Sequence, residues 1–399
     1  MFANDYLSKN NRSRIISENP DADCRTIVVI PCHNEPNILH TLQSLKNCIS
    51  PAGITEVLII INHSEKAETE IKEKNQRTLE EVSAWITENY TQKLKFFVIG
   101  PVELREKWAG VGLARKTGMD EAVARFNFLN NRRGIVVSLD ADTLVAENYL
   151  IEIEKHFKQN HTHVGATIAF EHQKEGLSEK QLRGIELYEQ YLKYYKDALS
   201  YTGYPFSMFT VGSAFAVSAE AYVKRGGMNR RQAGEDFYFL QNLVQLGTVG
   251  EITSTKVYPS ARSSNRVPFG TGAAMQKWID GTEDLTQTYN FQAFIELKEF
   301  FDIKEKLFKV SETEQKQIIG NLPDAISSFI ESDNFYAELA DLNKNCSNLK
   351  TFQTRFFYQF NAFKVLKYLN FTHEKHFEKA DLIDQIIALN ETKNSCYIH

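Results

Sequence analysis

The stretch Gly134–Thr143, Gly-Ile-Val-Val-Ser-Leu-Asp-Ala-Asp-Thr, ends an apolar run in two carboxylates that are one residue apart. A short Val/Ile/Leu run predicts a strand buried on both faces, and open α/β sheets bind ligands where such strands end. Asp140 and Asp142 are therefore expected in a ligand crevice, where their hard oxygens suit Mg or Mn. Such a cation can hold a diphosphate and neutralise charge on a leaving group. The alternative is an acidic turn, because Asp is a common turn residue.

The composition is that of an ordinary globular protein. The chain has 399 residues, of which 42% are hydrophobic, enough for two domains or one large domain with an appendage. A net charge of -5 with interspersed signs gives no basic footprint, which argues against nucleic acid as a partner. No secretory signal or membrane span is evident, and five scattered cysteines are typical of reduced thiols. A cytoplasmic location is the resulting expectation.

The first half of the chain alternates strand and helix signals. Buried strands are predicted over 26–31, 56–61 and 95–99, and amphipathic helices follow the first two of them. A further helix, 110–126, carries a stripe of small residues at Ala114, Gly118 and Ala122. This order favours a parallel sheet with right-handed crossovers.

The pattern changes after about residue 160. Strands are predicted over 164–170 and 211–217, separated by a helix over 182–199. That helix is rich in tyrosine, and its rings could stack on a sugar or an aryl acceptor. The alternative is that the tyrosine face packs against the sheet.

Four segments in this order resemble the family 2 glycosyltransferases of the GT-A fold over about residues 25–270. They are Val-Val-Ile-Pro-Cys-His-Asn-Glu at 28–35, Leu-Ala-Arg-Lys-Thr-Gly at 113–118, Asp-Ala-Asp at 140–142 and Gly-Gly-Met…Gly-Glu-Asp at 226–236. The resemblance implies an α/β fold with a mostly parallel sheet flanked by helices. It also implies transfer of one sugar from a nucleotide-diphosphate donor to a hydroxyl of a glycan, lipid or aryl acceptor, usually with inversion.

The resemblance divides the chain into a tail, 1–24, a catalytic domain, 25–275, and a helical C-terminal domain, 276–399. It assigns metal coordination to Asp142 and the donor ribose or a metal-bound water to Asp140. Arg115 is expected to face the donor base or phosphate, with a solvated helix residue as the alternative. The loop expected over the nucleoside contributes Pro31, His33 and Glu35.

Asp236 is the candidate general base. A carboxylate at the start of a helix stays ionised through the helix dipole and is able to accept the proton of the attacking hydroxyl. Glu235 is expected to orient it or to bind the acceptor. The alternative is that both residues only cap the helix.

The loop 260–272 is dense in turn formers and carries Arg262 and Arg266, so it is expected to close over the diphosphate, with Arg266 binding the donor. Processive relatives carry a Gln-x-x-Arg-Trp motif at this place. The motif is absent here, and one sugar is therefore expected per encounter.

One departure concerns the donor base. Family members present an acidic residue after the second strand, whereas this chain has Asn62, followed by His63. An amide oxygen still accepts a hydrogen bond from a ring N–H, without charge. This departure keeps a catalytically silent nucleotide-sugar-binding protein open as an alternative, and a sugar-phosphate nucleotidyltransferase is another.

The stretch 276–399 carries no family motif and is expected to be helical. Phe356, Phe360 and Phe363 fall on one helical stripe, with Lys364 and Lys367 close by. Such a stripe could dock the enzyme peripherally on the inner membrane surface. Packing of this stripe against the catalytic domain is the alternative.

Overall fold

The computed structural model describes residues 1–10, 12–231, 234–264 and 270–396. It has two compact units, the first made of Met1–Leu177 and Thr210–Met275, the second of Ser178–Phe209 and Gln276–His399. The three-part division expected from the sequence stays a prediction. Within the described residues, no helix has the length and apolar character needed to cross a bilayer.

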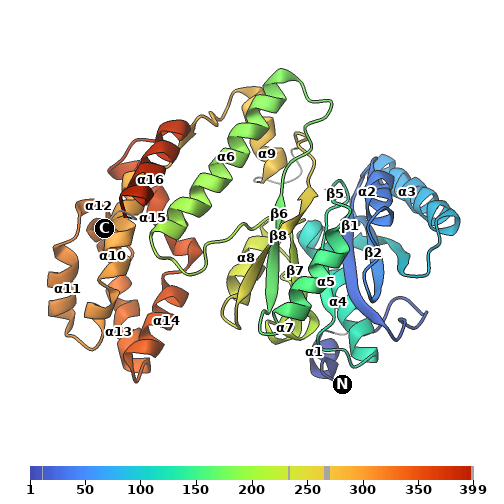
Figure 1. Cartoon of the computed structure of the whole chain (residues 1–399), viewed down its shortest axis with the longest axis horizontal. Helices are drawn as coiled ribbons and strands as arrows, with labels where there is room; N and C mark the ends of the chain where they lie inside the picture. Colours follow the sequence, from blue (N-terminus) through green and yellow to red (C-terminus); the bar gives the residue numbers. More distant parts are fainter. Residues whose placement is uncertain (11, 232–233, 265–269, 397–399) are drawn as a thin grey trace. The chain divides into compact units, whose positions relative to one another are not determined.

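The first unit is built on a sheet that has eight strands in the described part of the chain, in the order β3-β2-β1-β4-β7-β6-β8-β5 (Figure 1). Strands β1 to β4 pair in parallel, as do β6 and β8, whereas β7 and β5 are antiparallel to their partners. The predicted α/β fold with a mostly parallel sheet is confirmed. The strands are β1 Cys24–Cys32, β2 Ile54–Ser64, β3 Leu94–Leu104, β4 Ile135–Ser138, β5 Leu144–Val145, β6 Gly165–Phe170, β7 Phe215–Ser218 and β8 Val249–Tyr258.

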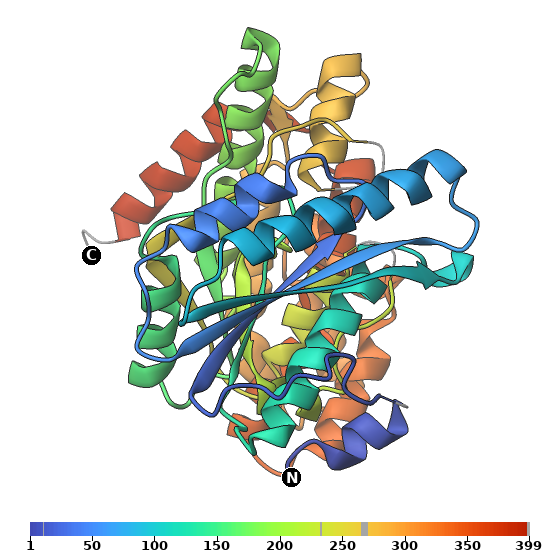
Figure 2. The same cartoon turned by 90° about the vertical axis from the view of Figure 1, so that its right-hand side faces the viewer.

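Helices cover both faces of this sheet, because successive side chains of a buried strand point to opposite faces. Val28 and Ile30 of β1 join the core cluster that includes α2 and α3, whereas Val29 between them faces α4. Figure 2 shows α2 and α3 over one face of the strands and α4 on the other. The helical elements are α1 Asn4–Lys9, α2 Ile38–Lys46, α3 Thr69–Glu88, η1 Glu106–Trp108, α4 Val111–Phe128, α5 Tyr149–Gln159, α7 Ala219–Lys224 and α8 Glu235–Leu243.

Two strand predictions need correction. The predicted strand 211–217 is shorter and later, since β7 begins at Phe215. Strand β8, Val249–Tyr258, was not predicted at all. It runs beside β6 but buries few apolar side chains, mainly Ile252 and Val257, so its sequence lacks the apolar run or strict alternation that marks a strand.

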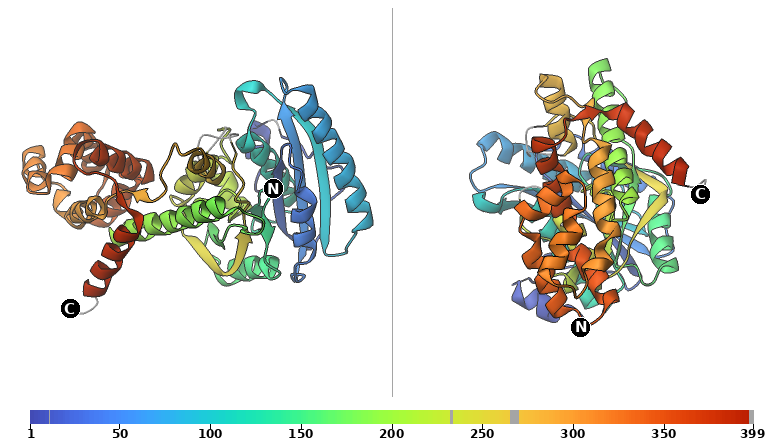
Figure 3. Two further views of the ribbon diagram at one scale, coloured as in Figure 1. Left: turned by 90° about the horizontal axis from the view of Figure 1, so that it is seen from above. Right: turned by 90° about the vertical axis from the view of Figure 1, so that its left-hand side faces the viewer.

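The second unit is helical around an aromatic core (Figure 3). Phe300, Phe356 and Phe360 are fully buried there, with the rings of Phe300 and Phe360 5.4 Å apart. A short antiparallel pair joins β9 to β10. The elements are α6 Glu179–Tyr201, α9 Thr271–Asp280, which begins in the first unit, β9 Gln287–Thr288, α10 Phe291–Asp302, η2 Lys304–Leu307, α11 Glu312–Gly320, α12 Asp324–Ser332, α13 Phe335–Asn345, α14 Leu349–Gln359, α15 Ala362–Lys375, β10 Ala380–Asp381 and α16 Leu382–Cys396.

The expected stripe of phenylalanines is wrong. Helix α14 ends at Gln359 and α15 begins at Ala362, so Phe356 and Phe363 lie on different helices. Phe356 and Phe360 are in the core, and Lys364 and Lys367 both pair with Asp333. Phe356 and Phe360 therefore pack in the core of their own unit, and the helical stripe that was expected to dock on a membrane does not form.

The tyrosines of α6 also contact residues of their own unit. Tyr194 is buried and donates to the backbone carbonyl of Tyr289 at 2.8 Å, and Tyr195 packs edge-on against Phe294. Tyr194 and Tyr195 thus pack on the segment that leads into α10 and on α10 itself, and not on the sheet as the structural alternative expected.

Gly118 sets the distance between α4 and the sheet, as its place in the small-residue stripe predicts. A Cβ atom at this position would overlap Val29 and lie 2.9 Å from Cγ1 of Ile60. We expect Gly118→Ala to lower the free energy of unfolding by about 1–3 kcal/mol, although Ala gains about 1 kcal/mol of helix propensity over Gly. Gly320→Ala, at the end of α11 with open space around it, is the matched control. Denaturant midpoints measure both, and equal midpoints would contradict the close packing.

Candidate functional site

Asp140 and Asp142 lie in the turn after β4, where the sheet changes from parallel pairing with β1 to antiparallel pairing with β7. Three hydrogen bonds fix the backbone of this turn. The Thr143 amide donates to the Asp140 carbonyl (3.1 Å), the Thr41 hydroxyl to the Ala141 carbonyl (2.9 Å) and the Gln173 amide to the Asp142 carbonyl (2.8 Å). The two carboxylates therefore leave a rigid turn at the crevice that open α/β sheets use for ligands.

Arg115 joins this turn to α8. Its guanidinium, on α4, donates to the carboxylates of both Asp140 and Glu235, and its side chain is 2% exposed. Glu235 is equally buried. The alternative of a solvated Arg115 is therefore wrong. Glu235 holds this guanidinium, and the pair fixes the first turn of α8 relative to Asp140.

Asp236 lies next to the same guanidinium. Helix α8 starts after Gly234, which has a φ of +69°, and the Asp236 carboxylate accepts from the Phe237 amide at 2.8 Å. Both groups lie beside Gly212. A Cβ atom added to this glycine would lie 3.0 Å from Arg115 Nη2 and 3.2 Å from Asp236 Oδ2. Burial raises the pKa of Asp236, and the charge of Arg115 lowers it in part. The carboxylate is thus a stronger base than an exposed aspartate.

Arg262 occupies the other side of the turn. Its Nη2 atom lies 2.6 Å from Glu35 Oε2 and 3.0 Å from Asp142 Oδ2. The pKa of Asp142 is raised to about 6, mainly by burial and also by the nearby charges of Asp140 and Glu35, against the opposing effect of Arg262. The three carboxylates together are therefore short of positive charge. Arg266, expected to bind the donor, lies outside the described residues.

The expected nucleoside loop follows β1. Pro31 is buried at the end of this strand, opposite Ile60 of β2, and His33 Nδ1 lies 2.9 Å from the Asn62 carbonyl oxygen. The side chain of Asn62 is buried, and its NH2 group donates to the Cys32 carbonyl at 2.9 Å. Asn62 thus bridges the ends of two parallel strands at the place assigned to the donor base.

Asn75, on α3, was not predicted. It is fully buried, accepts from the Asn34 amide at 2.9 Å and donates to the Asn62 carbonyl at 2.8 Å. Asn75 thereby holds the loop after β1 against the end of β2. A single Asn within a polar helix carries no sequence signal for such a role.

A buried polar network also supports the site from the N-terminal segment. Tyr6 and Tyr222 both donate to Asp120 Oδ1, at 2.7 and 2.9 Å, and Lys116 lies 3.1 Å from Asp120 Oδ2. Gly227, with a φ of +78°, approaches Tyr6 so closely that a Cβ there would overlap the phenol oxygen. Helix α1 thus packs on α4 and braces the Gly-Gly-Met turn that leads to α8. The sequence pattern of 1–24 gave no hint of this.

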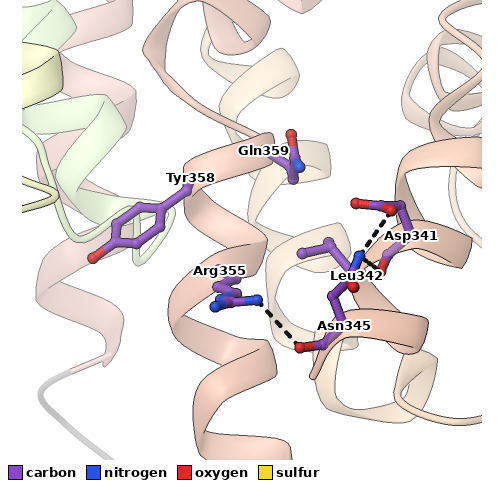
Figure 4. A pocket seen from close by; sticks show the side chains of 6 residues that line it. All are labelled: Asp341, Leu342, Asn345, Arg355, Tyr358 and Gln359. Atoms are coloured by element: carbon purple, nitrogen blue, oxygen red, sulfur yellow. Dashed lines mark hydrogen bonds between the residues drawn. The ribbon is translucent and has the colours of Figure 1, made fainter. Parts of the chain in front are cut away.

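A hollow in the second unit has no comparable chemistry. Its volume is about 340 Å³, and its polar side chains engage one another, with Asn345 donating to Asp341 at 2.8 Å and Arg355 donating to the Asn345 carbonyl at 3.2 Å (Figure 4). The titratable groups with a catalytic arrangement are those around Arg115.

The donor set of the first unit fits a hard divalent cation. No group of three or more His, Cys, Asp or Glu side chains with metal-site geometry occurs among the described residues. Mg²⁺ and Mn²⁺ do not need such a group, since they commonly bind one or two carboxylates and complete their shell with water and substrate phosphates. The pKa of Asp142 is raised mainly by burial and further by the negative charges of Asp140 and Glu35, and a bound cation would offset both effects.

Comparison with known proteins identifies the region that contains these residues. Residues 135–296 match the family described as "Glycosyl transferase family group 2". This stretch is similar to a family 2 glycosyltransferase domain. The match includes Asp140, Asp142, Glu235 and Asp236, and it starts after Arg115. No curated protein matches the chain.

Solved structures of glycosyltransferases share a general likeness with this enzyme. S. aureus TarS 1-349 in complex with UDP-GlcNAc has 12% sequence identity and a TM-score of 0.42, covering 84% of this chain and 91% of that one. The mannosyltransferase PcManGT from Pyrobaculum calidifontis, in complex with GDP-Man and Mn2+, has 14% identity and a TM-score of 0.37, covering 66% of this chain and 65% of that one. At these values the likeness carries no inference about donor or acceptor.

The raised pKa of Asp142 makes stability depend on pH. A carboxyl whose folded pKa is about 6, above its ordinary 3.8, binds its proton more tightly when folded, so the protein loses stability as pH rises between these values. We expect Asp142→Asn to remove this loss and to raise stability above pH 6 by roughly 1 kcal/mol, a few degrees in Tm, since the carboxyl is partly exposed. The difference in Tm should shrink below pH 4; a pH-independent difference would contradict the assignment.

Proposed function

We propose that this enzyme transfers one sugar from a nucleotide-diphosphate donor to an acceptor hydroxyl, with inversion and without processive addition. The observation that carries the proposal is the buried Arg115, which ties Asp140 at the end of β4 to the helix that carries Asp236. In this proposal Asp140, which Arg115 Nη2 contacts, belongs to the diphosphate site. Glu235, which Arg115 Nη1 contacts, is next to the base Asp236.

On the donor side, Asp142 and Asp140 would hold Mg²⁺ or Mn²⁺, whose positive charge offsets that of the departing nucleoside diphosphate. Arg262, which also pairs with Glu35, donates to Asp142 and holds its carboxylate in place. Asn62, His33 and Pro31 form the end of the sheet proposed for the nucleoside, where neutral groups replace the acidic residue of the family.

On the acceptor side, Asp236 accepts the proton of the attacking hydroxyl. Its raised pKa suits this task, because burial makes the carboxylate a better proton acceptor than an exposed aspartate. Glu235 acts as a positioning residue through Arg115. Arg115 holds the base and the site of the leaving group apart. This arrangement fits a direct displacement, in which the acceptor hydroxyl attacks opposite the leaving group and the anomeric carbon is inverted.

Single addition is proposed because the loop 260–272 lacks the Gln-x-x-Arg-Trp motif. A cytoplasmic location is part of the proposal and agrees with Cys24, Cys48 and Cys346, which form no disulfide.

Two substitutions separate donor binding from chemistry. We expect Asp236→Asn to lower release of nucleoside diphosphate by about 10²–10⁴-fold, the usual contribution of a general base, while a panel of nucleotide sugars with Mn²⁺ still raises Tm. Asp142→Asn should instead lose the Mn²⁺-dependent part of that rise in Tm. Glu220→Gln, a surface substitution on α7, is the control for both.

Full turnover by Asp236→Asn would remove it as the base. An unchanged Mn²⁺-dependent rise in Tm for Asp142→Asn would remove the metal assignment. Release of pyrophosphate from a nucleoside triphosphate and a sugar phosphate would favour a nucleotidyltransferase instead.

A further inference from the structure

Three cations where α4 and α8 begin contact aromatic rings and no carboxylate. The guanidinium of Arg231 lies 3.4 Å from the ring centre of Tyr238, and Arg230 and Lys107 each lie 5.5 Å from that of Trp108. Among the described residues, none of the three has a salt bridge. We call Lys107, Trp108, Arg230, Arg231 and Tyr238 the cation–aromatic cluster.

The cluster lies beside the helix of the proposed base. A Cβ on Gly112, in the first turn of α4, would overlap the Arg231 carbonyl oxygen and lie 3.2 Å from Cβ of Glu235. The backbone at 231 is thus packed on α4 directly beside Glu235, and Tyr238 is on the first turns of α8. Donor-side carboxylates Glu35 and Asp142 pair instead with Arg262.

The positive charge of the cluster has little local compensation. Glu106, next to Lys107, pairs with Lys66 at 2.6 Å. The pKa of Lys116 is lowered mainly by burial. The positive charges of Arg12 and Arg230 lower it further. Arg230, Arg231 and Lys107 are all exposed, so their N–H groups are open to a ligand.

We propose that the acceptor of this enzyme carries an anionic group, a phosphate or carboxylate, which the cation–aromatic cluster binds. The proposal rests on the proposed function and adds the chemical class of the acceptor. Guanidinium groups stacked on rings keep their edge N–H groups free and oriented, which favours bidentate contacts with such oxyanions. A neutral acceptor gives these three charges no partner.

Glycerol 1-phosphate is the probe, titrated into the full chain at low ionic strength with tryptophan fluorescence as the readout. UDP or GDP, whichever raises Tm, is present at saturation so that the donor diphosphate site is filled. We expect a saturable signal that weakens with added salt and is absent with glycerol. The double variant R230Q/R231Q should bind about tenfold or more weakly, the loss expected for one good charged contact.

Lys224→Gln, an exposed lysine on α7 paired with Glu220, should bind as the wild type does. Trp108→Phe should lose the fluorescence signal, because the other two tryptophans lie elsewhere: Trp85 packs on Phe96, and Trp278 is in the second unit. Since Arg230 and Arg231 are exposed, the double variant should keep the wild-type Tm.

Absence of saturable binding by the wild type, or equal affinity of R230Q/R231Q, would overturn the proposal. Loss of the nucleoside diphosphate's effect on Tm in R230Q/R231Q would assign the cluster to the donor and overturn it as well. These binding readouts need no turnover. A failure of the proposed function, such as full activity of Asp142→Asn, is therefore distinguishable from a failure of the cluster to bind the anion.

Discussion

The site depends on one buried charge, the guanidinium of Arg115. A charge removed from water costs several kcal/mol unless partners and hydrogen bonds replace its hydration. Here Asp140 and Glu235 supply them, and they come from the turn after β4 and the start of α8. The same ion pairs that offset this cost therefore fix the turn that carries Asp140 and Asp142 relative to the helix that carries Asp236. Any arrangement that separated the turn from α8 would leave a charge buried without a partner.

Other residues of α4 help to keep Arg115 at the end of β4. Gly118 lets α4 approach the sheet closely, so that Arg115, one turn earlier, reaches the end of β4. On the far side, Asp120 holds Lys116, Tyr6 and Tyr222 and so ties α4 to α1 and α7. The carboxylates around Asp142 are less well balanced, since burial and the charges of Asp140 and Glu35 raise its pKa despite Arg262.

The sequence predicts the elements of this site better than their connections. The run 134–139 marks a buried strand because it is apolar, and the motifs place Asp140, Asp142 and Asp236 at element ends, where the structure has them. The pairing of Arg115 with Glu235 spans 120 residues, and no local pattern encodes such a contact. Likewise, β8 takes its conformation from β6 and not from its own pattern. The helical stripe of phenylalanines failed because the chain turns at Phe360.

A double-mutant cycle on Arg115→Met and Glu235→Gln tests the central claim most directly. The free energies of unfolding of the wild type, both single variants and the double variant give the coupling between the two side chains. The account predicts that Arg115→Met alone costs about 3–5 kcal/mol, because it leaves Glu235 buried without a partner, and that the double variant recovers much of this loss. Additive losses, with a coupling near zero, would show that the ion pair does not hold the site together.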